Sequence, residues 1–206
     1  MIRSFFSVPR YLVIAVGLSM GGAVPAYAQQ GVTRSQEIGR PPEKGADVVQ
    51  GRYVFAGIGI DDYEHDEIWA RLDNAVNDIV AVRDILQEEF KFDAPEEWLL
   101  TNEQATAANI RVLIDDLRLN LQPDDNLIFF FAGHGISVPV EFDGEVVDNT
   151  AYIVPVEVKN YAHIAPSQYV EIEDLLESLA RLPARHVLAI FDSCESGLAL
   201  TAGQEF

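Results

Sequence analysis

The sequence contains a single cysteine, Cys194, among its 206 residues. One thiol cannot form an intramolecular disulfide, which excludes a fold organised by disulfides. Basic residues are also scarce, because 14 Lys and Arg stand against 33 Asp and Glu and give a formal net charge of −19. Such a field repels nucleic acid and anionic membrane surfaces and favours cationic partners, including Lys- or Arg-rich peptides and calcium. Acidity that serves solubility alone accounts for the same composition.

Long apolar runs are also missing. The longest, residues 11–24, is shorter than the ~20 residues that span a bilayer and is interrupted by glycines. Arg3 and Arg10 precede it without any acidic residue, and Ala26-Tyr27-Ala28 supplies the small residues of a cleavage site. Residues 1–28 are therefore predicted to be a secretory signal peptide, so we expect a periplasmic or secreted protein without stable membrane insertion. An uncleaved membrane anchor is the alternative.

Internal repeats and low-complexity tracts are absent, and the length favours one domain with one core. Residues 29–50 are polar and rich in glycine and proline, without helical or strand periodicity, and are predicted to be a flexible linker. Removal of the two arginines of the signal peptide takes the formal charge from −19 to −21. Residues 51–206 are predicted to form the domain.

Strand and helix patterns alternate within this domain. Strands are expected at 52–60, 97–100, 127–131, 151–154 and 186–191, helices at 73–89, 106–119 and 171–180, and a small hairpin within 138–155. Asp73 or Asn74 is expected to cap the first helix. The continuous apolar run 127–131 is typical of a strand buried on both faces of a parallel sheet. The order predicts an α/β fold with helices on both faces of an open sheet.

Two polar motifs follow buried strands of this sheet. Gly133-His134-Gly135 comes after the run 127–131, and Asp192-Ser193-Cys194-Glu195-Ser196-Gly197 comes after the run 186–191. Ligand sites of open α/β sheets form at the carboxyl ends of the strands. A lone histidine at a strand end is usually polar surface, and a lone cysteine is usually a small buried apolar residue. Because both stand at such ends in glycine-rich settings, we expect them to face one crevice.

Cys194 and His134 together fit nucleophilic catalysis. A free thiol, with a pKa of ~8.5, is mostly protonated at neutral pH, and a neighbouring imidazole can take its proton and later protonate a leaving amine. The oxyanion that develops needs donors, and the amides of Gly135 and Cys194 are placed to serve. The residues therefore predict a His134/Cys194 catalytic dyad.

These motifs resemble those of the caspase-like cysteine peptidases, the C14 family shared by caspases, metacaspases and related bacterial enzymes. Cys194 follows His134 by 60 positions, and the strand Phe129-Phe130-Phe131, the strand 151–155 and the helix segment 72–86 support the likeness. The resemblance implies a three-layer αβα sandwich with a mostly parallel central sheet, and a cysteine-type endopeptidase. It covers the chain from about Arg52 onward.

The resemblance to metacaspases also implies a substrate class. Asp192 matches their pocket acid and Asp78 resembles the second, so we expect cleavage after Arg, less strongly after Lys. Arg71 lies one position from where a caspase carries its aspartate-binding arginine, so a shift of one residue would favour cleavage after Asp. Asp78 as a solvated helix residue is the other interpretation of that position.

Glu195 departs from the metacaspase pattern, which commonly has His or another neutral polar residue there. A carboxylate beside the nucleophile raises the pKa of the thiol and opposes its activation. The acids of the hairpin could bind the calcium that some metacaspases require, but they lack the spacing of a known calcium loop. No metal or cofactor is therefore predicted.

The resemblance implies that the chain corresponds to the large-subunit (p20) portion of the family, without the small-subunit (p10) strands that complete the substrate cleft. The last strand is then expected to pair with such a segment, to pair with another chain, or to remain an exposed edge. A non-catalytic interaction domain in the cell envelope is therefore an alternative function. An unrelated flavodoxin-like domain fits the element order, but Gly57-Ile58-Gly59 lacks the phosphate-binding pattern.

Overall fold

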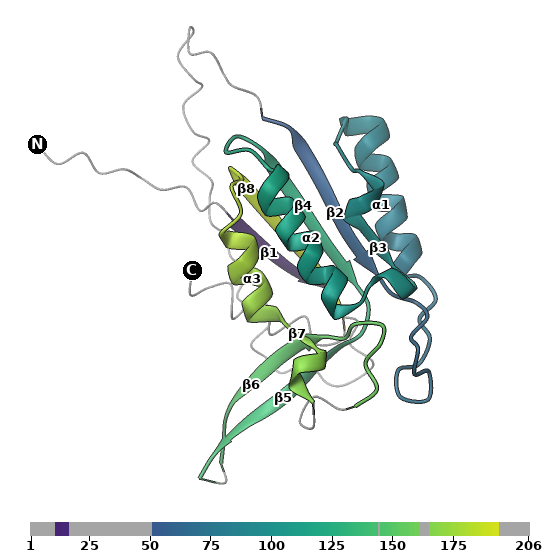
Figure 1. Cartoon of the computed structure of the whole chain (residues 1–206), viewed down its shortest axis with the longest axis vertical. Coiled ribbons are helices and arrows are strands. Elements are labelled where there is room, and N and C mark those ends of the chain that lie inside the picture. The colour runs from purple at the N-terminus through teal and green to yellow at the C-terminus, as the bar shows by residue number, and fades with distance from the viewer. Residues whose placement is uncertain (1–10, 17–50, 144, 161–164, 194–206) are drawn as a thin grey trace, which may run out of the picture.

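In the computed structural model, the described part of the chain contains three helices and two groups of strands, each of which forms a sheet (Figure 1). The structure describes residues 11–16 (backbone), 51–143, 145–160 and 165–193. The strands are β1 (Tyr11–Val16), β2 (Tyr53–Gly59), β3 (Leu99–Thr101), β4 (Asn126–Ala132), β5 (Gly135–Phe142), β6 (Glu145–Ile153), β7 (Val170–Glu171) and β8 (His186–Asp192). The helices are α1 (Ala75–Phe90), α2 (Ala107–Asn120) and α3 (Ile172–Ala180), with short 3₁₀ turns at Glu96–Trp98, Asn102–Gln104 and Pro166–Gln168.

The main sheet has five parallel strands in the order β1-β8-β4-β2-β3. β4 lies at its centre, where Ala132 is in register with Gly59 of β2 and with Asp192 of β8. The strands therefore end at the same edge of the sheet, and the segments that follow β2, β4 and β8 start side by side. A smaller antiparallel sheet, β5-β6-β7, lies beyond this edge.

Helices cover both faces of the main sheet. α2 and α3 lie on one face and α1 on the other (Figure 1). The larger apolar cluster joins α2 and α3 to Val54, Ala56 and Ile58 of β2, whereas the smaller one joins α1 to Phe55 of the same strand. This alternation along β2 is expected of a strand buried on both faces. The predicted αβα sandwich with a parallel central sheet is confirmed.

Most predicted elements appear within a few residues of their expected bounds. α2 buries Ile110, Leu113, Ile114 and Leu117 on one face, as its periodicity predicts, and Thr106 caps it by accepting from the Asn109 amide (3.1 Å). The strand expected at 97–100 is displaced, because Glu96–Trp98 forms a 3₁₀ turn and β3 begins at Leu99. The predicted hairpin is confirmed and is longer than expected, since β5 begins at Gly135.

β1 lies within the segment that the sequence predicts to be a signal peptide. It pairs in parallel with the whole of β8, from Tyr11 beside Val187 to Val16 beside Asp192. The outer edge of β8, where we expected a small-subunit strand, another chain or an open edge, is thus occupied by residues 11–16. The rest of the predicted signal peptide and the predicted linker 29–50 lie outside the described residues. None of the described helices has the length and hydropathy needed to span a membrane.

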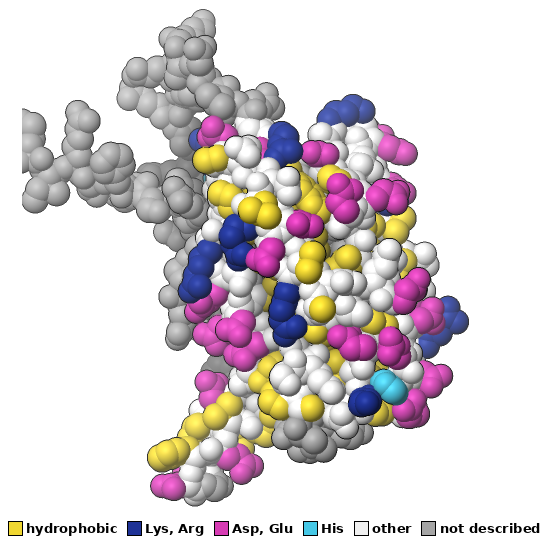
Figure 2. Space-filling model, viewed as in Figure 1, with side chains coloured by type: hydrophobic (Ala, Val, Ile, Leu, Met, Phe, Trp, Pro, Cys, Tyr) yellow, Lys and Arg dark blue, Asp and Glu magenta, His cyan; other side chains and the backbone are white. Residues whose placement is uncertain are grey.

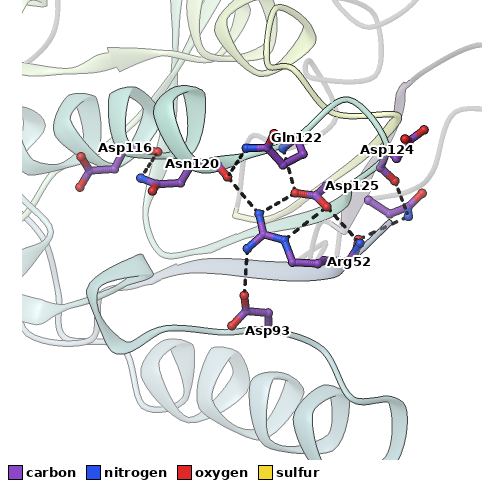
Figure 3. A network of polar contacts seen from close by, with 8 residues as sticks. Arg52, Asp93, Asp116, Asn120, Gln122, Asp124 and Asp125 are labelled. Atoms are coloured by element: carbon purple, nitrogen blue, oxygen red, sulfur yellow. Dashed lines mark hydrogen bonds and ion pairs between the residues drawn. The ribbon is translucent and has the colours of Figure 1, made fainter. Parts of the chain in front are cut away.

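A polar network stabilises the opposite, amino end of the sheet (Figure 3). The side chain of Asp125 is 3% exposed and accepts from the guanidinium of Arg52 (2.7 Å), from the Arg52 amide (3.0 Å) and from the Gln122 amide (2.9 Å). Burial opposes ionisation of Asp125, but the bonds from Arg52 and Gln122 and the Arg52 charge together lower its pKa. Arg52 also pairs with Asp93 (3.3 Å), so the network joins β2 to the segments before β3 and β4.

Candidate active site

The predicted site residues gather where β4 and β8 end. Gly133 and His134 directly follow β4, and Ser193 directly follows β8. The Gly133 amide donates to the carbonyl of Asp192 (3.1 Å), which joins the two strand ends. Cys194 and Glu195 lie outside the described residues. The structure therefore shows the site up to the residue that precedes the predicted nucleophile.

Aromatic side chains hold the ring of His134. Its centroid lies 4.9 Å from that of Tyr63 and 5.8 Å from that of Trp69. The Tyr63 hydroxyl accepts from the His134 backbone amide (2.8 Å). Both aromatic residues belong to the segment between β2 and α1, so this segment fixes the position and the plane of the imidazole.

A backbone carbonyl fixes the proton on the ring. Nε2 of His134 lies 2.7 Å from the carbonyl oxygen of Ala70. Because a carbonyl oxygen can only accept, Nε2 carries the proton in this arrangement. In the neutral imidazole Nδ1 is then the basic nitrogen, which is the form a general base needs.

The segment that carries Tyr63, Trp69 and Ala70 is itself fastened at both ends by Asp61. Asp61 is 9% exposed as a residue, and its carboxylate accepts from the amides of Ala75 (2.7 Å) and Val76 (3.3 Å) at the start of α1. The Asp61 carbonyl accepts from the Leu72 amide (3.0 Å). Segment 61–74 is thus a closed loop that joins the end of β2 to the start of α1.

The predicted cap of α1 was wrong. Asn74 occupies the N-cap position but makes no side-chain capping bond, and Asp61 supplies the carboxylate instead. The helix N-terminus attracts a carboxylate because its first amides lack partners within the helix. Asp61 stands 14 residues before Ala75, so a local capping pattern in the sequence could not reveal it.

A cavity of about 200 Å³ opens beside His134. Its lining includes His134, Asp192, Ser193 and the turn 72–75 that leads into α1. A larger cavity of about 630 Å³ lies between α2 and α3 and contains none of the predicted site residues. The smaller cavity is therefore the candidate substrate pocket.

Of the two predicted pocket acids, Asp192 lines the cavity beside His134, whereas Asp78 is absent from its lining. Asp192, at the end of β8, is half-buried, and Asp78 is exposed in the first turn of α1. Burial raises the pKa of Asp192, and the negative charge of Asp78 raises it further. A cation bound beside Asp192 would offset both of these effects and favour its ionised form.

Arg71, the alternative specificity residue, has a carboxylate partner. Its Nε lies 2.9 Å from Asp62 Oδ1, and the two side chains are 70% and 57% exposed. Arg71 is also missing from the lining of the cavity beside His134. A substrate aspartate would thus have to compete with Asp62 for this guanidinium.

Gly135, the predicted oxyanion donor, starts β5 in close contact with Ser193. A Cβ atom at position 135 would lie 2.8 Å from Ser193 Oγ and 3.1 Å from its Cβ, so only glycine fits without a shift. The amide of Val154 donates to the carbonyl of His134 (3.0 Å), so these two residues are a hydrogen-bonded pair of the antiparallel ladder. Because hydrogen-bonded and non-hydrogen-bonded pairs alternate in such a ladder, the next pair, Gly135 and Ile153, is not hydrogen-bonded. The amide of Gly135 therefore points away from β6.

The sequence pointed to His134 and the acids but missed the supports of the imidazole. Tyr63, Trp69 and Asp61 follow β2 at the same carboxyl edge, and aromatic residues in a polar loop were a signal that could have found the first two. No sequence signal marks the Ala70 carbonyl, since every residue has a backbone carbonyl group.

Comparison with known proteins agrees with this geometry. Residues 55–202 match the model of the metacaspase, peptidase C14 domain. The chain belongs to the metacaspase family. The match covers more than half of the sequence and includes the segments that follow β2, β4 and β8. The chain is also 32% identical over 137 residues to metacaspase-1 from Ajellomyces capsulatus, and 31% identical over 137 residues to metacaspase-1A from Aspergillus clavatus.

Both alignments cover 63% of this metacaspase chain. They cover 37% of the Ajellomyces protein and 31% of the Aspergillus protein, so the chain spans about a third of the length of these relatives. A crystal structure of protein GSU0716 from Geobacter sulfurreducens superimposes on 75% of the chain and on 55% of its own, with a TM-score of 0.54 and 19% identity. At this identity the likeness shows the fold alone.

Proposed function

We propose that this metacaspase domain is a cysteine endopeptidase that hydrolyses peptide bonds after arginine, and less readily after lysine, with His134 and Cys194 as the dyad. The orientation of His134 is the observation that carries the proposal. With Nε2 bound to the Ala70 carbonyl, Nδ1 is the nitrogen available to accept a proton. His134 and Asp192 also line the same cavity, so base and specificity acid face one ligand.

The chemistry follows from these roles. Nδ1 of His134 takes the proton of the Cys194 thiol, and the thiolate attacks the substrate carbonyl carbon while the C=O electron pair moves to oxygen. The amides of Gly135 and Cys194 stabilise this oxyanion. The C–N bond then breaks, the imidazolium protonates the leaving amine, and water hydrolyses the thioester by the same route.

Asp192 and Asp78 would bind the substrate cation. A guanidinium can bridge two carboxylates with paired hydrogen bonds, whereas an ammonium acts as a compact point charge. This difference favours Arg over Lys. Removal of one of the two carboxylates should lower kcat/KM for an Arg substrate about 10- to 100-fold, as expected for a charge-assisted hydrogen bond.

The test is hydrolysis of fluorogenic peptides that end in Arg, Lys or Asp. The chain is compared with its Cys194→Ala, Asp192→Asn and Asp78→Asn variants, and with Asp84→Asn as a matched control on α1, where Asp84 pairs with Arg83. We expect turnover after Arg that is lost in Cys194→Ala, reduced in the two pocket variants and unchanged in Asp84→Asn. Cleavage after Asp alone would refute the pocket assignment, and a folded chain that cleaves none of the peptides would refute the peptidase.

The pH dependence gives a second readout. As the solution is acidified, Asp192 becomes protonated and KM for the Arg peptide should rise. Because the pKa of Asp192 is raised, this rise should begin at a higher pH than it would for an ordinary carboxyl group. Asp78→Asn removes the like charge, so this limb should move to lower pH. A limb that stays in place would mean that the two carboxylates do not act together.

We also propose that residues 1–28 direct export. The proposal rests on Arg3 and Arg10, the apolar run 11–24 and the small residues Ala26-Tyr27-Ala28. Sequencing of the amino terminus of protein recovered from the periplasm or the medium should begin at Gln29. Protein that remains in the cytoplasm with Met1 intact would contradict it.

A further inference from the structure

The hairpin of β5 and β6 extends well beyond the core (Figure 1). We define the arm as its outer part, residues 139–143 and 145–149. Four of its apolar side chains are strongly exposed: Val140 at 41%, Phe142 at 70%, Val146 at 58% and Val147 at 60%. Figure 2 shows hydrophobic and acidic side chains next to one another along this arm.

One face of β5 has the pattern of a strand that is buried on that face. Ile136, Val138, Val140 and Phe142 alternate with the residues between them and so share one face. Ile136 and Val138 pack against the core, whereas Val140 and Phe142 continue the same row into solvent. The described residues thus leave the outer half of an apolar row exposed.

Carboxylates stand beside this row. Asp148 of β6 is in register with Val140. The register shifts between Val140 and Glu141, so that Glu145 is in register with Phe142, and residues in register share a face. The sequence has no Lys or Arg between Arg118 and Lys159, so no basic residue of β5 or β6 neutralises these acids. The face of the arm is therefore apolar on one strand and negative on the other.

We propose that this face binds an extended segment of a protein substrate in which apolar and basic residues alternate at every second position, an inference that rests on the proposed peptidase function. In an extended chain every second side chain points to the same side, so apolar residues on the side that faces the arm can pack on Val140 and Phe142, while basic residues on that same side pair with Asp148 and Glu145. β5 starts one residue after His134, so a polypeptide held at the candidate site can continue along the arm.

The charge of the face argues against two other occupants. In a symmetric pair of copies the same patch meets itself, which brings the carboxylates of the two chains together. An anionic membrane surface repels the same carboxylates. A basic polypeptide has the complementary charge.

Binding is measured on the Cys194→Ala variant, which does not depend on turnover. The probes are a fluorescent peptide that repeats Val-Ser-Lys-Ser, so that valine and lysine alternate on one side of the extended chain, and a matched peptide with glutamate in place of lysine. We expect the lysine peptide to bind, and Phe142→Ser or a Glu145→Lys and Asp148→Lys double variant to weaken it at least about tenfold. Glu141→Lys is the control, because Glu141 pairs with Val146 on the other face and should leave binding unchanged.

A further control separates the arm from the pocket. Asp192→Asn should retain binding of the lysine peptide, and the arm variants should retain wild-type kcat/KM on the short Arg peptide while cleaving an unfolded lysine-rich protein more slowly. Equal binding of the glutamate peptide, binding that the arm variants do not change, or concentration-dependent dimerisation through Phe142 would overturn the inference. Since binding is read without catalysis, failure of the peptidase leaves this test intact.

Discussion

Replacement of Asp61 tests how the fold orients His134. Asp61→Ala removes the carboxylate that accepts from Ala75 and Val76 and leaves both amides without that partner. Loss of a helix cap costs about 0.5–2 kcal/mol, and loss of a negative charge at a helix N-terminus about 0.3–1 kcal/mol. We therefore expect the free energy of unfolding to fall by about 2 kcal/mol, which lowers Tm by roughly 4–8 °C in a domain of this size.

The catalytic effect should exceed the loss of folded protein. Segment 61–74 carries the Ala70 carbonyl that binds Nε2 of His134, and displacement of a catalytic group by about 1 Å can cost roughly 100-fold in rate. We expect kcat for the Arg peptide to fall at least about tenfold with little change in KM, because Asp192 stays in place.

The assay pairs thermal unfolding with steady-state kinetics well below Tm. Asp61→Asn is the matched variant, since its amide oxygen can still accept from Ala75, and it should recover most of kcat while it lacks the charge. A lower Tm with unchanged kcat in Asp61→Ala would refute the link from the cap to His134. An unchanged Tm would refute the capping role itself.

Two further predictions concern the ends of the sheet. Asp125→Asn should lower the free energy of unfolding by about 1–2 kcal/mol at neutral pH, a modest loss because Arg52 is 45% exposed. Because the pKa of Asp125 is lowered in the folded protein, its carboxylate contributes to the free energy of unfolding at pH values above the pKa that Asp125 has in the unfolded chain. This contribution is lost as the pH falls through the pKa of the folded state. Urea titrations should therefore show the difference between Asp125→Asn and wild type vanish over that pH range. Gly135→Ala should displace Ser193 and reduce kcat while costing about 1–3 kcal/mol of stability, and Ser193→Gly in the same chain should restore both. Retention of full activity by Gly135→Ala alone would contradict the close contact.

Much of the fold could be predicted because its signals are local. The apolar run of β4 and the one-sided periodicity of α2 each lie within a short window of sequence, and both elements form where expected. The same holds for His134 at the end of β4 and Asp192 at the end of β8, because strand ends of a parallel sheet meet at one edge. The pairing of Asp78 with Asp192 comes from the family resemblance and stays a prediction; the charge of Asp78 raises the pKa of Asp192, but Asp78 does not line the cavity beside His134.

The remaining features depend on contacts between distant residues. Asp61 caps α1 from the far end of a loop, and Ala70 acts through its backbone, so neither has a residue pattern of its own. The pairing of residues 11–16 with β8 could not be foreseen either, because an apolar run long enough for a signal peptide also suits a buried strand. The hairpin was expected, but its sequence pattern does not show how far it extends beyond the core, so the exposure of Val140 and Phe142 could not be foreseen.

If residues 1–28 direct export as proposed, the position of β1 makes export and folding compete for the same residues. The same six residues, Tyr11–Val16, serve either as the core of an export signal or as the edge strand of the sheet, and they cannot do both at once. A newly made chain that folds quickly would bury the export signal within its sheet. A chain that is exported and cleaved first would fold without β1 beside β8. The proposed export would then require slow folding inside the cell, which agrees with the slow formation of parallel sheets.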